Sequence, residues 1–470
     1  MIEPTELQSY AGRPAAAGGR APDPVNAPMI RHWCEAMGDA NPAYAGPDAI
    51  APPAMLQVWT MAGLSGHGSR SGAYDELLGR LDADGYASVV ATDCEQEYLA
   101  PLRPGQRVLF ESEIETVSPE KTTALGTGHF VTTRTELRAY DEAAGEKPEE
   151  ARPVATHRFR ILKFRPAAGE QPPRRSAEPG AGQSARQPTG QPKRGHGTGL
   201  RPRPVVNRDN EGFWQGVAEG ELRFQRCTDC ATPRFPWLPG CNACGSDAWS
   251  AEAASGEGTV YSQVVVHHPL PAAFAAPYSV ALVELAEGVR VVSNVVGLAP
   301  DQVRIGLPVR LSLERCDDEL TLPLFRPAGP DHLPVLRIPV TRTLIVAGAI
   351  ATRDYQDVHH DAELARAKGA PDVFMNILTS NGLVGRYVTD WAGSGATILR
   401  IALRLGVPAY PGDELTFTGR VVDRVPGRSD PGAGGDGRTE LTLAVVGSTA
   451  RGAHVTAEVR LLADPSGGPA

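Results

Sequence analysis

An acid and an imidazole stand close together in the C-terminal third of the chain, a pairing that suits proton-transfer chemistry. Both belong to the run Asp354-Tyr355-Gln356-Asp357-Val358-His359. On a regular helix, the five positions from Asp354 to His359 would turn the two side chains about 140° apart. A loop at Asp354 that leads into a helix near His359 would let both face one cleft, with Asp357 or Asp361 capping that helix. A plain structural role, with His359 solvated at a helix start, is the alternative.

Four cysteines have the spacing of a metal site. Cys227 and Cys230 form one Cys-x-x-Cys pair, and Cys241 and Cys244 form the next. Two such pairs supply four thiolates in the tetrahedral arrangement that Zn²⁺ prefers. Because protein ligands would fill every position, we expect a structural zinc with no open site for catalysis. Four incidental cysteines are the alternative.

The run that contains the acid and the imidazole has an incomplete repeat near the start of the chain. Asp39-Ala40-Asn41-Pro42-Ala43-Tyr44 keeps the acid and replaces the histidine with tyrosine. A second match follows each run in the same order, Pro101-Leu102-Arg103-Pro104-Gly105-Gln106 and Pro408-Ala409-Tyr410-Pro411-Gly412-Asp413. The cysteine pairs lie between the two copies. The sequence therefore predicts the order repeat, insert, repeat.

Composition limits the class of protein. With 470 residues and 41% hydrophobic content, about three domains are expected, and a net charge of −9 argues against a generally polyanion-binding surface. Seven cysteines with four in one cluster are too few and too localised for a disulfide framework, so a reducing compartment is expected. Cys34, Cys94 and Cys316 should be plain buried residues. No apolar run is long enough for a membrane span, which predicts a cytoplasmic protein.

The elements that must position these residues follow from hydrophobic periodicity. In the first copy we expect helices at 28–38 and 53–64, the second largely buried, and strands at 108–114, 122–140 and 156–164. In the second copy we expect a short helix at 361–368, a buried central helix at 377–391, and strands from Thr397 onward, with a Gly- and Pro-rich loop at 424–438.

The middle of the chain separates into a linker and a small β domain. Residues 166–204 are rich in Pro, Gly, Gln and Arg, which predicts a disordered tether. A basic arm for nucleic acid or an acidic partner is the alternative for this stretch. After a short helix around Phe213 and Trp214, strands are expected at 258–267, 278–284, 289–296 and 309–314. These strands suit a small barrel.

The run of Asp354 to His359, the His-Asp pair after it, the buried helix and Pro-x-x-Pro-Gly-Asp together resemble the MaoC-like hydratases of the hotdog fold. Asp354 and His359 fall on that family's catalytic pair. The chain departs from the family at Asp357, where proline is usual, and at Asn376, near a position that is often glycine. The first copy, with Tyr44 instead of histidine, resembles a non-catalytic hotdog partner.

The middle segment resembles the acyl-CoA-associated DUF family, in which a rubredoxin-like zinc ribbon precedes an OB-fold. The matching stretches are Phe213-Trp214, Leu222-Arg223-Phe224-Gln225-Arg226-Cys227, Gly256-Glu257-Gly258-Thr259-Val260 and Leu322-Pro323-Leu324-Phe325-Arg326-Pro327. The same combination occurs as two chains in heteromeric steroid side-chain hydratases that work with a thiolase-like aldolase. This chain is similar to both subunits fused end to end.

The resemblance implies an α+β architecture of two hotdog domains forming a double hotdog, with the zinc ribbon and OB-fold β-barrel inserted between them. The expected boundaries are 1–165 for the non-catalytic hotdog, 166–204 for the linker, 205–330 for the inserted domain and 331–470 for the catalytic hotdog. A homo-oligomer is also expected. A first copy without histidine would widen its half of the tunnel for a bulky acyl group, with simple structural pairing as the alternative.

The activity implied is hydration of an α,β-unsaturated acyl-CoA. Asp354 would act as general base on a water, and His359 would orient that water or relay a proton. Backbone N–H groups near Asn376 and Ile377 would bind the developing enolate, and Thr379 would support the aspartate. The expected cofactor is a structural Zn²⁺, and the expected substrate is a CoA thioester. Its acyl group stays open between steroid-like, polyketide and fatty.

Two other functions are compatible with the sequence. Dehydration of a 3-hydroxyacyl thioester, in fatty or polyketide metabolism, is the same chemistry reversed. A scaffold whose OB-fold binds single-stranded nucleic acid is the non-enzymatic alternative, but such folds usually carry stacking aromatics on a basic groove. Only 6% of this chain is aromatic. We therefore expect the inserted domain to dock a protein, a thiolase-like aldolase, and expect neither nucleic acid nor membrane as partner.

Overall fold

The computed structural model describes residues 4–16, 18–64, 70–123, 125–166, 201–268, 273–274, 277–329, 331–426 and 438–463. The chain divides into two compact units, residues 1–166 with 330–470, and residues 167–329. The first unit contains both copies of the repeat, and the second contains the cysteine pairs. Most of the expected linker (167–200) and most of the Gly- and Pro-rich loop (427–437) lie outside the described residues.

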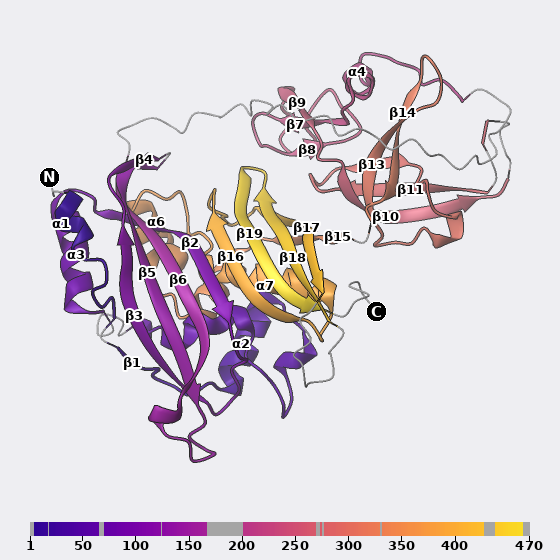
Figure 1. The fold of residues 1–470 in the computed structure, drawn as a ribbon. Coiled ribbons are helices and arrows are strands. Elements are labelled where there is room, and N and C mark those ends of the chain that lie inside the picture. Colours follow the sequence, from indigo (N-terminus) through magenta and orange to yellow (C-terminus); the bar gives the residue numbers. More distant parts are fainter. Residues whose placement is uncertain are drawn as a thin grey trace. The chain divides into compact units, whose positions relative to one another are not determined.

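Both copies of the repeat contribute strands to one antiparallel sheet (Figure 1), which in the described residues has 11 strands. Its order is β1 (Gly19–Arg20), β3 (Arg107–Val117), β5 (Gly126–Tyr140), β6 (Arg152–Pro166), β2 (Ser88–Tyr98), β16 (Thr397–Leu405), β19 (Gly452–Ala463), β18 (Thr439–Thr449), β17 (Glu414–Pro426) and β15 (His332–Pro339), with β4 (Lys121–Thr123) paired to β5. The copies meet where β2 pairs with β16. This continuous sheet is the double hotdog that the resemblance implies.

Complementary charges cross the seam between β2 and β16. Arg400 on β16 lies 3.0 Å from Glu95 on β2, and Arg404 lies 3.1 Å from Asp93. Arg400 also contacts Glu458 of its own half at 2.6 Å. Acids on one central strand and arginines on the other favour pairing of two different halves over pairing of like halves, since identical strands would place like charges opposite one another.

Helices connect the strands of this sheet, and the central ones belong to the core that the two copies share. In the first unit these are α1 (Pro4–Gln8), α2 (Ala27–Met37), α3 (Gly72–Ala83), α5 (Arg342–Ala351), α6 (Ala362–Ala367) and α7 (Ile377–Ala392), with 3₁₀ turns η1 (Pro42–Tyr44), η2 (Pro53–Thr60), η4 (Pro148–Glu150) and η6 (Asp357–His359). The prediction of a helix at 28–38 is confirmed by α2, which Asn26 caps and Gly38 ends in the left-handed conformation. Of the helices described, none is long and apolar enough to cross a membrane.

The central helix α7 is buried almost all round and contacts both halves. Gly382 lets α2 approach closely, because a Cβ at this position would lie 2.8 Å from the ring of Trp33. The buried helix predicted at 377–391 is therefore confirmed. The core that surrounds α7 contains apolar side chains from both copies of the repeat.

The first copy lacks an equivalent long helix. The stretch predicted as a helix at 53–64 is buried as expected but forms the shorter 3₁₀ segment η2, and this part of the prediction is wrong. Asn376 caps α7 through its side chain, whereas Pro52 before η2 makes no side-chain cap bond. Without a cap, the short run winds as 3₁₀ turns, which rarely extend far.

Several elements were not predicted. The helix α5 is nearly all apolar and therefore has little amphipathic signal, and β2 is a central strand that carries the polar run Asp93-Cys94-Glu95-Gln96-Glu97. The prediction that all three remaining cysteines are buried is also wrong. Cys94 is buried and Cys34 is half-buried, but Cys316 is exposed because it follows the end of a strand in a turn.

The second unit is built from a helix and two small sheets. The helix is α4 (Glu211–Glu219), and β7 (Arg223–Cys227) lies between β8 (Pro233–Arg234) and β9 (Trp249–Ala253). The larger sheet has the order β12 (Arg290–Ser293), β11 (Tyr278–Leu285), β10 (Glu257–Val266), β13 (Pro308–Arg315) and β14 (Thr321–Pro327), and the turn η5 spans Pro300–Gln302. One apolar core joins helix and sheets. The strands predicted for this segment are present.

Candidate active site and metal centre

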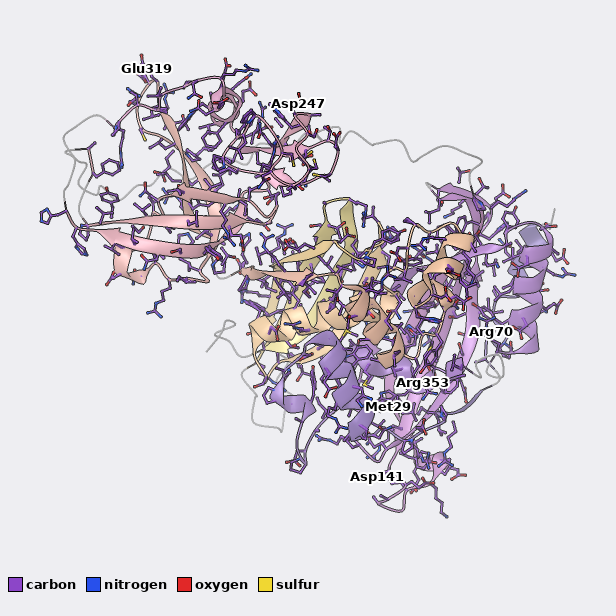
Figure 2. All side chains as sticks on the ribbon, turned by 180° about the vertical axis from the view of Figure 1, so that it is seen from behind. Met29, Arg70, Asp141, Asp247, Glu319 and Arg353 are labelled. Atoms are coloured by element: carbon purple, nitrogen blue, oxygen red, sulfur yellow. The ribbon has the colours of Figure 1, made fainter. Side chains whose placement is uncertain are left out.

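A sharp turn after α5 places Asp354. Thr352 ends the helix, and Arg353 adopts the left-handed conformation with φ of 57°. The turn sends the Asp354 N–H back to the carbonyl of Ala349 (2.9 Å). The guanidinium of Arg353, labelled in Figure 2, lies 3.3 Å from Asp23 of the N-terminal half. This turn holds Asp354 at the edge of a cavity, with its side chain 15% exposed.

The imidazole of His359 is held by a backbone carbonyl. It lies at the end of η6, where Nδ1 is 2.7 Å from the carbonyl oxygen of Phe374 and the ring packs edge-on against the Phe374 ring. A carbonyl oxygen only accepts, so the proton of the neutral imidazole is assigned to Nδ1. Nε2 then carries a lone pair and faces Asp354 Oδ2 at 3.5 Å. That distance exceeds a good hydrogen bond and leaves both atoms able to accept from a third group.

Asn376 fixes the aspartate to the start of the central helix. Its Nδ2 donates to Asp354 Oδ2 (3.0 Å) and to Thr352 Oγ1 (2.8 Å), while its Oδ1 accepts from the Thr379 N–H (2.8 Å). The supporting role that the sequence gave to Thr379 therefore belongs to Asn376. Among the described residues the Thr379 hydroxyl has no hydrogen-bond partner, and it lies against Gly348 of α5.

The start of α7 offers hydrogen-bond donors to the cavity. The cap uses the Thr379 N–H, and the Ser380 N–H reaches the carbonyl of Asn376. The N–H groups of Ile377 and Leu378 come before any intrahelical acceptor, and both residues line the cavity. The positive end of the helix dipole, roughly half an elementary charge, favours negative charge at this point. These groups suit a developing oxyanion.

The two remaining acids near the turn have separate structural roles. Asp361 caps α6 by accepting from the N–H groups of Glu363 and Leu364. Asp357 lies 2.7 Å from Lys368, and this contact lowers the pKa of its carboxyl. Of the two acids proposed as caps, Asp361 is the one that caps the helix.

The cavity beside Asp354 and His359 has a volume of about 270 Å³. The C-terminal copy supplies its polar end. The N-terminal copy supplies an opposite wall that is mainly apolar, formed by Gln57, Met61, Val89, Val90, Ala91, Phe159 and Ile161. Gln57 is the polar exception in that wall. Its Oε1 is buried and has no hydrogen-bond partner among the described residues. Sequence reasoning missed this wall, since the residues lie far from Asp354 in the chain.

The four predicted metal ligands come together in the second unit. Their Sγ atoms all lie within 4.8 Å of one another, with 3.6 Å between Cys227 and Cys244 and 3.5 Å between Cys230 and Cys241. The two pairs form matching turns, in which the first cysteine's carbonyl accepts from the N–H of Ala231 or Gly245, both at positive φ. Four sulfurs at this spacing fit a tetrahedral Zn²⁺, whose Zn–S bonds are about 2.3 Å long.

Three family models match parts of this chain. They are the "FAS1-like, dehydratase domain region" over residues 15–146, the "ChsH2, rubredoxin-like zinc ribbon domain" over 214–250 and the "ChsH2, C-terminal OB-fold domain" over 251–314. The first match lies in the N-terminal copy of the repeat, and the other two lie in the second unit. These matches confirm the predicted zinc ribbon and OB-fold.

A long relative decides the family. The "Probable enoyl-CoA hydratase alpha subunit" of Thermomonospora curvata is 44% identical over 338 residues, covering 69% of this chain and 97% of that protein. The chain belongs to this enoyl-CoA hydratase family. Two proteins of Mycobacterium tuberculosis, named as the alpha and beta subunits of 3-oxo-4,17-pregnadiene-20-carboxyl-CoA hydratase, are 37% and 51% identical over 66% and 27% of this chain. The alignments cover 94% and 91% of those subunits, so the hydratase chain is similar to both.

Solved structures give related matches. A chain from the structure named "Ltp2-ChsH2(DUF35) aldolase" is 52% identical, covers 27% of this hydratase chain and 99% of its own, and has a TM-score of 0.26. A chain named "MaoC-like dehydratase" is 14% identical over 97% of this chain and 99% of its own, with a TM-score of 0.48. The predicted combination of a MaoC-like region with a zinc ribbon and an OB-fold is thus confirmed by the family models and relatives together.

Proposed function

We propose that this enzyme adds water to the double bond of a 2-enoyl-CoA and forms the 3-hydroxyacyl-CoA. The observation that carries the proposal is the pair of acceptors, Asp354 Oδ2 and His359 Nε2, which lie 3.5 Å apart at a cavity bordered by the start of a helix. Two acceptors at this separation suit one bound water, which has two protons to donate.

In the proposed mechanism Asp354 is the general base. It removes one proton from the water while His359 Nε2 accepts the other hydrogen as a hydrogen bond and so orients the oxygen. The oxygen forms a bond to the β-carbon, and the electron pair of the double bond moves through the α-carbon toward the thioester oxygen. The carboxyl of Asp354 then returns its proton to the α-carbon, which balances the reaction and restores the carboxylate.

The N–H groups of Ile377 and Leu378 are proposed to hold the thioester oxygen as it becomes negative. They point from the start of α7, where the helix dipole adds to the two hydrogen bonds. Donors of this kind contribute about a hundredfold or more to the rate of related reactions. Of the three positions predicted to bind substrate, Ile377 would do so through its N–H, whereas Asn376 would act through Asp354 and Thr379 packs against Gly348 of α5.

We further propose a bulky, steroid-like acyl group. Support comes from the N-terminal half, whose short η2 leaves a wall of Met61, Val90 and Phe159 where the catalytic half has the long helix α7. The similarity to subunits named as a pregnadiene-carboxyl-CoA hydratase supports the same size class. The non-catalytic copy would then widen the acyl site, as the missing histidine suggests.

The second unit is proposed to bind one structural Zn²⁺ at Cys227, Cys230, Cys241 and Cys244, and to dock a thiolase-like aldolase. A 3-hydroxyacyl thioester is a substrate for retro-aldol cleavage, so the product of hydration suits such a partner. Holding the two enzymes together would raise the product concentration at the second site. The boundaries proposed for the three domains remain 1–165, 205–330 and 331–470.

Substitution of the two acceptors tests the activity. Asp354→Asn and His359→Ala are each expected to lower kcat/KM for a bulky enoyl-CoA by at least about a hundredfold, the scale of general acid–base loss. Tyr44→Ala is the matched control from the non-catalytic copy and should leave kcat/KM within a few-fold of wild type, because Tyr44 does not line the cavity beside Asp354. Equal losses from Tyr44→Ala and His359→Ala in folded protein would refute the assignment of a single catalytic half. Activity with 3-hydroxyacyl-CoA as the only substrate consumed would favour dehydration instead.

A binding experiment tests the partner. Full-length chain carrying Cys227→Ser, with the zinc ribbon disrupted, is expected to keep hydratase activity and to lose co-purification with a thiolase-like aldolase supplied in equal amount. Retained aldolase binding by this variant, or recovery of single-stranded nucleic acid by the intact chain, would refute the docking proposal.

A further inference from the structure

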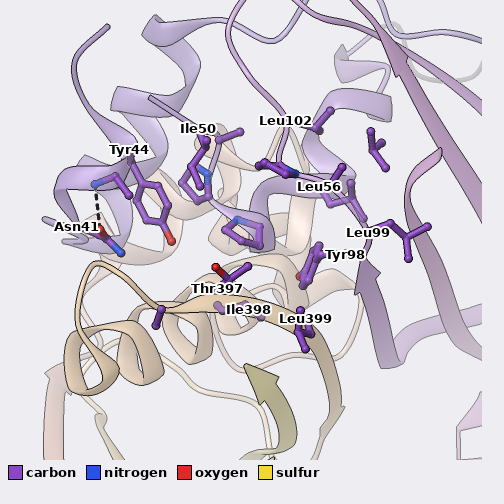
Figure 3. Close-up of a pocket in the computed structure, with 18 of the residues that line it drawn as sticks. Asn41, Tyr44, Ile50, Leu56, Tyr98, Leu99, Leu102, Thr397, Ile398 and Leu399 are labelled. Carbon is purple, nitrogen blue, oxygen red and sulfur yellow. Dashed lines mark hydrogen bonds between the residues drawn. The ribbon is translucent and has the colours of Figure 1, made fainter. Parts of the chain in front are cut away.

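A second cavity of about 200 Å³ lies in the first unit, at the copy that lacks the histidine (Figure 3). In Figure 3 the rings of Tyr44 and Tyr98 and the side chains of Ile50 and Leu56 border it. Both copies of the repeat line this cavity. The first copy contributes Asn41, Ala43, Tyr44, Ile50, Ala51, Pro52, Pro53, Leu56, Tyr98, Leu99, Ala100, Pro101, Leu102 and Val154, and the second contributes residues 394–399. Nothing in the hydration mechanism uses this space.

This cavity repeats the construction of the catalytic cavity. In each case one wall is the turn after a helix, carrying His359 in one copy and Tyr44 in the other. The opposite wall is the start of the other half's central strand, Val89–Ala91 of β2 for the catalytic cavity and Thr397–Leu399 of β16 for the second one. The second cavity is therefore the duplicated counterpart of the catalytic one.

Each polar feature needed for hydration is missing from the counterpart. Tyr44 replaces the imidazole, and Asp39 accepts from the Asn41 N–H of its own loop (3.0 Å) and does not line the cavity. Burial raises the pKa of the Asp39 carboxyl. Pro52 and Pro53 are the N-cap and the first residue of η2, the positions that Asn376 and Ile377 hold in α7, and proline has no N–H to donate.

The remaining lining selects an uncharged ligand. Among the described lining residues there is no Lys, Arg, His, Asp or Glu, so nothing in the wall would offset a buried charge. The hydroxyl of Tyr98 is already used, since it donates to Gln96 Oε1 (2.6 Å). Aromatic rings, prolines and aliphatic side chains make up most of the wall. Apolar cavities of this order of size accept compact hydrocarbons.

The two cavities touch the same short segment. Leu56 of η2 lines the second cavity, and Gln57, the next residue, lines the catalytic one. No described residue lines both, so the second cavity is a separate space and not an extension of the acyl site. A ligand that packs against Leu56 would bias the position of Gln57 in the catalytic wall.

We propose that the second cavity is a ligand site for a compact, uncharged and mainly apolar molecule, such as an alicyclic alcohol, and that its occupancy alters substrate binding through η2. The binding step stands independently of the proposed hydratase activity. The effect on substrate rests on that activity.

The test uses the full-length protein with cyclohexanol and the cyclohexanecarboxylate ion as matched probes. Saturation-transfer NMR should show cyclohexanol bound with a Kd in the millimolar range or tighter, and the ion bound at least about tenfold more weakly because of its charge. Ala43→Phe fills the second cavity and should abolish cyclohexanol binding. Ala91→Phe fills the catalytic cavity instead and should leave it unchanged. Ala396→Leu, at the opposite wall, provides a second filling variant if Ala43→Phe does not fold.

Kinetics then separates the two parts of the proposal. Saturating cyclohexanol should change the KM for enoyl-CoA at least about twofold in the wild type and not in Ala43→Phe, whose own kcat should stay near wild type. Binding that is lost in Ala91→Phe and kept in the filling variants would place the probe in the catalytic cavity and overturn the site. Binding without any change in KM would overturn the coupling through η2, and absence of binding would overturn the site whatever the activity.

Discussion

Asn376 donates a hydrogen bond from Nδ2 to Oδ2 of Asp354 over 3.0 Å, and so joins the aspartate to the N-terminus of the central helix. The same side chain caps that helix through Oδ1. One residue thereby fixes both the proposed base and the N–H groups proposed to bind the thioester oxygen. A shift of either group relative to the other would require this amide to break a bond.

Asn376 is predicted to position the base independently of its role as helix cap. Asn376→Ser keeps a capping oxygen but loses the N–H donor to Asp354, so kcat should fall at least about tenfold while the free energy of unfolding changes little. Asn376→Ala should lose the rate and, in addition, about 1 kcal/mol of stability. Steady-state kinetics with urea denaturation compares them. A Ser variant with wild-type kcat would show that Asp354 needs no such support.

Gln57 is predicted to recognise a polar group on the acyl chain. Its Oε1 is buried without a partner among the described residues, which costs about 1–3 kcal/mol in the free protein. Gln57→Leu should therefore stabilise the protein and shift the ratio of kcat/KM values toward acyl groups that are pure hydrocarbon. Met61→Leu, in the same wall, is the apolar control. An unchanged substrate ratio in Gln57→Leu would refute the prediction.

The cysteine cluster is predicted to hold one zinc per chain. Metal analysis of protein purified without chelator should find about one equivalent, because four thiolates at this spacing complete the tetrahedral coordination of Zn²⁺. Chelation should unfold the second unit while hydration survives better than that unit's fold. Cys241→Ser should lower the zinc content, and Cys316→Ser, which changes an exposed cysteine outside the cluster, should not. Protein without zinc would contradict the assignment.

The folded protein is predicted to lose stability in acid through His157. Burial lowers the pKa of this imidazole from 6.5 to about 4. Below pH 6.5 this imidazole binds a proton in the unfolded chain but stays neutral in the folded chain. The free energy of unfolding therefore falls as the pH drops toward 4. The loss between pH 7 and 5 is about 2 kcal/mol for this group. His157→Gln should remove it, and substitution of the exposed His32 should not, in urea denaturation at both pH values.

The amino-acid sequence alone determined which chemical groups are available and the order of the parts. The four thiolates, the acid with its imidazole, and the loss of histidine at Tyr44 are covalent facts with fixed spacing, and local periodicity was enough for α2 and α7. Elements without a clear periodic signal, such as α5 and β2, were not predicted, because their burial comes from neighbours distant in the chain.

Only the tertiary structure decided which groups share a cavity. The support of Asp354 by Asn376 depends on how the turn after α5 meets the start of α7. The wall with Gln57 comes from residues about two hundred to three hundred positions away in sequence. The second cavity follows from the approximate twofold relation of the copies, because each half places the start of its central strand over the other half's turn. Such contacts arise from packing between elements, and sequence spacing carries no record of that geometry.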